Sequence, residues 1–220
     1  MLPDSEIDLE DEFTHIFRST VGLALVQTSG QNIDRLVTIY RACLKTGREL
    51  VVDLYTAMIL EATRNPKIPQ SHWNRMALCI PSRQRIQIKK SGWFEALGRH
   101  SSRRLYLNRD IAKDPGKYLL IFCGLWMGDL DRAGCLDGAC LIHSQWEGYL
   151  RETRFKEIDV WRKRHNIRFH QVHNREVCKV PVLNNDEPLD TELSDLHFLV
   201  QYLVTRYQRA QQLYDDQQLI

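Results

Sequence analysis

The sequence lacks the segments that direct a protein into a membrane or out of the cell. No apolar run approaches the ~20 residues that a membrane-spanning helix needs. Residues 1–17 contain six acidic residues and no lysine or arginine, so the basic start of a signal peptide is also missing. These absences predict a cytoplasmic protein.

The motifs of the common hydrolases and nucleotide-binding enzymes are missing too. There is no His-x-His-x-Asp-His or His-Glu-x-x-His metal motif, no Gly-x-Ser-x-Gly elbow and no Gly-x-x-x-x-Gly-Lys loop. We therefore expect no catalytic residue and no metal site, although His170, His173 and Cys178 leave room for a makeshift one. None of the six cysteines forms a Cys-x-x-Cys pair, which favours reduced, buried thiols (Cys43, Cys79, Cys123, Cys135, Cys140 and Cys178).

Apolar runs predict six strands, and apolar residues at helical spacing predict helices between them. The strands are expected at 21–26, 49–54, 76–80, 118–123, 139–143 and 167–172. Strands that alternate with helices are typical of an α/β fold, here a mainly parallel, Rossmann-like sheet with helices on both faces. One long basic helix is expected from Ser82 towards Gly98, and the glycine-rich stretch 124–138 is expected to be a mobile loop.

The composition changes at Pro181–Pro188, which predicts two parts, an α/β domain over 1–182 and an acidic linker with a helix over 183–220. Apolar residues at helical spacing between Leu189 and Tyr207 predict an amphipathic helix over 189–213. Such a helix either packs on the sheet or serves self-association and docking to a partner.

The small net charge of +2 conceals a separation of charge along the chain. Residues 18–182 hold 28 basic and 15 acidic residues, a net charge of +13, between two acidic ends. A basic body favours a polyanionic partner such as RNA or single-stranded DNA, and an evenly solvated basic surface is the alternative. The basic residues are densest around a single acid, Glu95, in the cluster Arg83, Arg85, Lys89, Lys90, Arg99, Arg103 and Arg104.

Polar side chains follow three of the predicted strands. Thr28, Ser29, Asn32 and Arg35 follow the first strand and begin a helix, where free backbone N–H groups attract anions. Trp146 follows the fifth strand within the segment Ser144–Tyr149, and His173 follows the sixth strand. Because the carboxyl ends of parallel strands share one edge, these residues predict a phosphate-binding ledge with Trp146 available for base stacking.

Two alternatives remain open at this edge. Asp53 ends the second strand, where it could serve chemistry or cap the next helix through Thr56. Trp146 and Tyr149 could stack on a ligand or pack in the core at a helix start.

Three segments carry a resemblance to a known family. They read Ser29-Gly-Gln-Asn-Ile-Asp-Arg35, then Gly47-Arg-x-x-Val-Val-Asp53-x-Tyr55-Thr-Ala57, then Ser144-x-Trp146-x-Gly148-Tyr149. In order and spacing this set resembles the β-CASP cap region of metallo-β-lactamase-fold hydrolases related to ribonuclease J, over roughly residues 1–173. The resemblance implies that the loop matching 28–32 lines a nucleic-acid phosphate pocket.

The same resemblance implies that the zinc or manganese of the family is bound by a catalytic half that this chain lacks. Met1-Leu-Pro matches the point just after that half, and Asn174-Arg-Glu-Val-Cys178 replaces the second histidine of the family's closing motif. We therefore expect a non-catalytic domain that binds a nucleic-acid backbone. The alternatives are a subunit of a metal-dependent nuclease whose metal ligands come from a metallo-β-lactamase-fold partner chain, and an interaction or vestigial module without a ligand.

Overall fold

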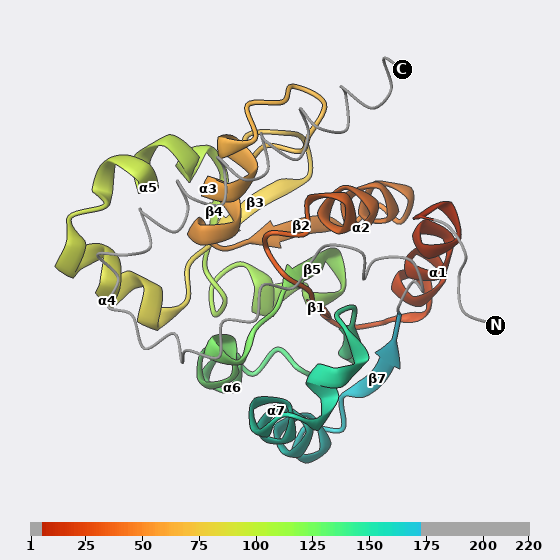
Figure 1. Ribbon diagram of the computed structural model, residues 1–220. Helices are drawn as coiled ribbons and strands as arrows, with labels where there is room; N and C mark the ends of the chain where they lie inside the picture. Colours follow the sequence, from red (N-terminus) through yellow and green to blue (C-terminus); the bar gives the residue numbers. More distant parts are fainter. Residues whose placement is uncertain (1–5, 173–220) are drawn as a thin grey trace.

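The computed structural model describes residues 6–172, which form one seven-stranded, all-parallel sheet (Figure 1). Across the sheet the strand order is β4-β3-β2-β5-β1-β6-β7. The strands are β1 (Ala24–Gln27), β2 (Glu49–Val52), β3 (Met76–Cys79), β4 (Arg104–Leu105), β5 (Tyr118–Ile121), β6 (Cys140–His143) and β7 (Arg168–Gln171). The predicted α/β, Rossmann-like fold class is confirmed.

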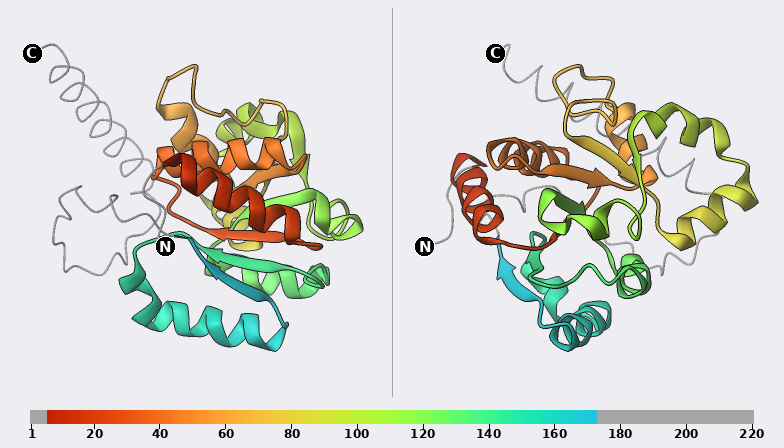
Figure 2. Two further views of the ribbon diagram at one scale, coloured as in Figure 1. Left: turned by 90° about the vertical axis from the view of Figure 1, so that its right-hand side faces the viewer. Right: turned by 180° about the vertical axis from the view of Figure 1, so that it is seen from behind.

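Helices cover both faces of the sheet, as the left view in Figure 2 shows with α1 and α2 on one side and α7 on the other. The α-helices are α1 (Glu6–Ser19), α2 (Ile33–Lys45), α3 (Leu54–Ala62), α4 (Ser82–Ser91), α5 (Phe94–His100), α6 (Met127–Ala133) and α7 (Thr153–Arg164). Short 3-10 turns η1 (Ser101–Arg103), η2 (Ile111–Lys113), η3 (Pro115–Lys117), η4 (Gly124–Trp126) and η5 (Glu147–Arg151) complete the connections.

Each face of the sheet has its own apolar core. On one face Leu36 and Ile39 of α2 pack with Phe13 of α1 and with alternate strand residues such as Val26. On the other face the stacked rings of Phe122 and Trp161, with centroids 5.5 Å apart, pack among the strand residues that point the opposite way. This alternation of side chains is what allows a parallel sheet to be buried on both faces.

A buried arginine closes the amino edge of the sheet. The Arg48 side chain donates to the carbonyl oxygens of Gly22 at 3.0 Å and Tyr118 at 3.1 Å, and also to that of Thr20. Burial lowers the pKa of this guanidinium. Because these carbonyls belong to the segments that lead into β1 and β5, Arg48 ties together the starts of the two central strands.

Three predictions about secondary structure were wrong. The two-residue strand β4 is an additional strand, and it pairs with the end of β3. The single helix expected from Ser82 is interrupted at Gly92, whose φ of +71° suits glycine, so α4 and α5 are separate. The stretch expected to be a mobile loop contains η4 and α6, whose Trp126 and Leu130 are buried in the second core.

Several predictions lie outside the described residues. These are the position of His173, the boundary between 182 and 183, and the amphipathic helix over 189–213. Among the helices of residues 6–172, none is long and apolar enough to cross a membrane.

Candidate functional site

The structure brings two of the predicted loops together at the carboxyl edge of the sheet. Gln27 at the end of β1 lies in register with His143 at the end of β6, and the loops beginning at Thr28 and Ser144 follow directly. The guanidinium of Arg35 donates a hydrogen bond to the hydroxyl of Ser144 and so connects the loops. Both of these side chains are buried, Arg35 with only 2% of its surface exposed.

Most of the polar side chains predicted to bind phosphate here have structural roles. The Asn32 side-chain oxygen accepts a hydrogen bond from the backbone N–H of Arg35 at 3.0 Å and caps α2. The exposed Ser29 hydroxyl accepts one from the backbone N–H of Gln31 at 3.2 Å. Thr28 is buried, and its hydroxyl oxygen makes no hydrogen bond with any described residue. Ser29 and the half-buried Asn32 are therefore the members of this group that reach solvent.

Trp146 lies on the surface rather than in the core. It is 55% exposed, and Tyr149, at 43%, meets its ring edge-on with centroids 5.6 Å apart. The ring lies so close to the backbone at Gly148 that a Cβ there would approach it to 2.2 Å. Of the two alternatives for Trp146 and Tyr149, core packing is thus wrong, and an exposed aromatic pair stands beside the β6 loop.

Asp53 follows β2 on the same edge and caps α3. Its carboxylate accepts hydrogen bonds from the backbone N–H of Thr56 at 2.8 Å and from the side chain of Gln84 at 3.2 Å. Burial raises the pKa of Asp53 even though these hydrogen bonds oppose the shift. Tyr55, the next residue but one, accepts a hydrogen bond from Gln31 at 2.8 Å and so joins the β1 and β2 loops.

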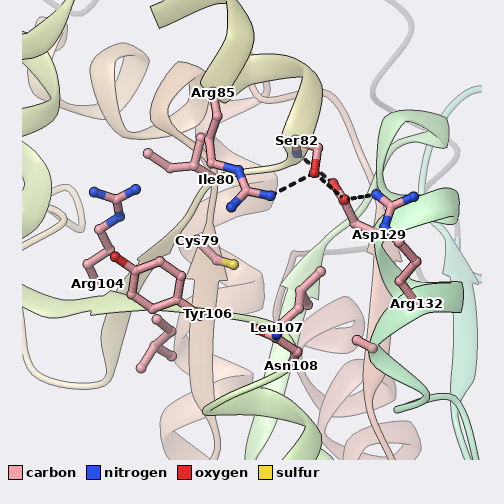
Figure 3. Close-up of a pocket in the computed structure, with 12 residues that line it drawn as sticks. Cys79, Ile80, Ser82, Arg85, Arg104, Tyr106, Leu107, Asn108, Asp129 and Arg132 are labelled. Carbon is pink, nitrogen blue, oxygen red and sulfur yellow. Dashed lines mark hydrogen bonds and ion pairs between the residues drawn. The ribbon is translucent and has the colours of Figure 1, made fainter. Parts of the chain in front are cut away.

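A pocket of about 200 Å³ opens beyond the carboxyl ends of β3 and β4 (Figure 3). We call it the arginine pocket, because Arg85 of α4, Arg104 of β4 and Arg132 of α6 line it. Arg85 and Arg132 are exposed, and Arg104 is half-buried with its guanidinium 5.2 Å from the centre of the Tyr106 ring. The remaining lining residues are Cys79, Ile80, Ser82, Leu105, Tyr106, Leu107, Asn108, Asp129 and Ala133.

Asp129 is the one acidic side chain among the pocket-lining residues. Its carboxylate accepts hydrogen bonds from the backbone N–H of Ser82 at 2.6 Å, from the Ser82 hydroxyl at 2.5 Å and from the Arg132 guanidinium. Burial acts to raise the pKa of Asp129, but the hydrogen bonds from Ser82 and Arg132 outweigh it and hold the pKa below its ordinary value. Asp129 is therefore a charged carboxylate at neutral pH that joins α6 to the start of α4.

Sequence reasoning identified the arginine pocket only in part. Arg85 and Arg104 belong to the dense basic cluster, but Arg132 and Asp129 lie in the glycine-rich stretch that suggested no chemistry. The spacing of these two residues, three apart, is the signal that could have indicated an ion pair on one helix face.

Comparison with models of protein families and with curated protein sequences found no match for this chain. The fold and the side-chain geometry therefore carry the functional argument. Within the described part of the chain, no three His, Cys, Asp or Glu side chains come together to hold a metal ion. The zinc or manganese implied by the resemblance does not fit those residues.

Proposed function

We propose that this chain is a β-CASP-like domain, non-catalytic on its own, that binds the phosphate backbone of RNA or single-stranded DNA. The observation that carries the proposal is the uncompensated positive charge of α4. Between Ser82 and Ser91 this helix contains two arginines, two lysines and no acidic residue, and its other side chains are neutral. Arg83, Lys89 and Lys90 are exposed and form no ion pair with any other described residue.

The exposed aromatic pair supports the same function. Single-stranded nucleic acids bind to surfaces that combine cationic side chains for the backbone with aromatic rings on which bases stack. Trp146 supplies such a ring on the carboxyl edge, next to the loop that carries Ser29 and Asn32. In this proposal Arg35 is a positioning residue, because its buried guanidinium holds the β6 loop through Ser144.

The test is binding of a labelled single-stranded oligonucleotide as a function of salt. A protein that neutralises phosphates on a single strand loses affinity with a log–log slope of about −0.7 per phosphate. Replacing Arg83, Lys89 and Lys90 by Gln should therefore make the slope shallower by about 2. Fluorescence anisotropy over a range of potassium chloride concentrations measures it.

A matched control replaces three exposed cations elsewhere, Arg41, Lys67 and Lys156, by Gln. This variant has the same net charge as the α4 variant and should keep the wild-type slope. The proposal fails if the wild-type protein does not bind at low salt, or if the two triple variants lose affinity equally.

A further inference from the structure

We propose that the arginine pocket is a binding site for a single phosphate group, held by the guanidinium groups of Arg85, Arg104 and Arg132. The proposal goes beyond backbone binding by α4, because it assigns a discrete site in which Arg85 of α4 acts together with Arg104 of β4 and Arg132 of α6. The phosphate could belong to a nucleic acid or to a free phosphorylated small molecule, and the chemistry of recognition is the same in both cases.

The charges that line the pocket favour an anion. Three arginines and one aspartate are among the lining residues, which leaves a net charge of +2. Each guanidinium has five N–H donors. Among the described residues, Arg85 and Arg132 use them for one side-chain partner each, Ser82 and Asp129, so most of their donors remain available to a ligand.

One hydrogen-bond network holds two of these arginines in place. The Arg85 guanidinium donates to the Ser82 hydroxyl at 2.6 Å, and that hydroxyl donates to the Asp129 carboxylate, which also accepts from Arg132 (Figure 3). Asp129 thereby positions both cations, while its own oxygens accept hydrogen bonds from Ser82 and Arg132. A site that is ordered before its ligand arrives loses less entropy on binding.

Arg104 is placed by a different contact. Its guanidinium lies over the Tyr106 ring at 5.2 Å, within the range of a cation–π interaction. The planar fork of a guanidinium matches phosphate oxygens in pairs, which is why arginine is preferred for this recognition. Arginines from α4, β4 and α6 line this one small cavity.

The size and lining of the pocket limit what it can hold. Its volume of about 200 Å³ is below the roughly 300–1,000 Å³ of pockets that enclose drug-sized ligands. A phosphate group with part of its substituent fits this space better than a whole dinucleotide. The apolar lining, including Ile80, Leu105 and Leu107, lowers the local dielectric and strengthens the attraction between guanidinium and phosphate.

The experiment is a calorimetric titration of the full chain with inorganic phosphate, against sodium chloride at matched ionic strength. Wild-type protein should bind phosphate, and the double variant Arg85→Gln/Arg104→Gln should bind it at least about tenfold more weakly, since it loses two charge-assisted contacts. The control is the double variant Arg41→Gln/Lys67→Gln, which removes the same charge at exposed positions outside the pocket and should bind phosphate as wild type does. Unchanged thermal unfolding of each variant verifies that it is folded.

The proposal is overturned if phosphate binds no better than chloride, or if the pocket variant and the control bind it equally. A competition experiment shows which kind of molecule supplies the phosphate group. If inorganic phosphate displaces a labelled oligonucleotide beyond the ionic-strength effect, the site takes a nucleic-acid phosphate. The alternative outcome is that inorganic phosphate does not displace the oligonucleotide, while a nucleoside monophosphate or a sugar phosphate binds to wild-type protein and not to the pocket variant. In that case the site takes a small phosphorylated molecule.

The two proposals fail separately in these experiments. Oligonucleotide binding without phosphate binding would refute the phosphate site in the arginine pocket and support the proposed function. Phosphate binding without oligonucleotide binding would refute the proposed function and support the phosphate site in the arginine pocket.

Discussion

The β1–β6 half and the β3–β4 half of the carboxyl edge use their polar side chains differently. In the first half Arg35 is buried and bonded to Ser144, and Asn32 caps α2. In the second half Arg85 and Arg132 are exposed around a cavity and keep most of their donors uncommitted. A polar residue after a parallel strand is therefore not by itself a ligand contact, because the protein can use it to hold its own loops together.

The largest expected effect separates a structural arginine from a surface one. Replacing Arg35 by Met should lower the free energy of unfolding by about 3 kcal/mol, because Ser144 loses its partner in the interior. The exposed Arg41→Met on the same helix should change it by less than about 0.5 kcal/mol. Urea denaturation followed by circular dichroism measures both. A stable Arg35→Met protein with weakened oligonucleotide binding would instead make Arg35 a ligand contact.

The next effect concerns the carboxylate of the arginine pocket. Asp129→Asn should lower the free energy of unfolding by about 2 kcal/mol at pH 7, since the hydrogen bonds from Ser82 and Arg132 are made to a charged group. The exposed Asp137→Asn is the control and should be neutral.

The same carboxylate gives a pH dependence with a definite sign. The pKa of Asp129 is lowered in the folded state, so its stabilisation is present above the unfolded pKa of about 3.9 and is lost as the pH falls through the folded value. Wild-type protein should lose more stability than Asp129→Asn between pH 5 and 2. Parallel curves for the two proteins over that range would show that Asp129 has no such role.

The smallest effect tests the cap of α2. Asn32→Ala should cost about 1 kcal/mol, whereas Asn32→Ser should cost little because serine is also a good N-cap residue. If both variants bind the oligonucleotide like wild type once folded, Asn32 acts as a cap only. If Asn32→Ser restores stability but not binding, the side chain contacts the ligand as well.

The fold could be predicted from the sequence because its central strands are continuous apolar runs. β4 could not, because it is two half-buried residues that pair only with the end of β3. α6 was missed because Gly128 lies within it and Gly124 and Gly134 lie on either side, and its place depends on burying Trp126 and Leu130 against strands distant in the sequence.

The candidate site, too, could be predicted from the sequence only in part. The convergence of the loops after β1 and β6 follows from parallel pairing, so spacing alone could predict it. The burial of Arg35 could not be predicted, since arginine is seldom buried and its partner Ser144 is 109 residues away. The arginine pocket is formed by residues of α4, β4 and α6. Because these elements are separate in the sequence, no local sequence pattern predicts the pocket.

The place of β5 between β2 and β1 has a consequence for how this chain is made. β1 and β2 leave the ribosome before β5 and do not pair with each other, since each pairs with β5 instead. About 65 residues separate the end of β2 from the start of β5. At roughly 5–20 residues per second, the nascent chain carries two unpaired strand edges for several seconds before the central strand arrives. The cooperative unit of folding therefore extends at least to Ile121, and shorter nascent chains expose strand edges that chaperones recognise.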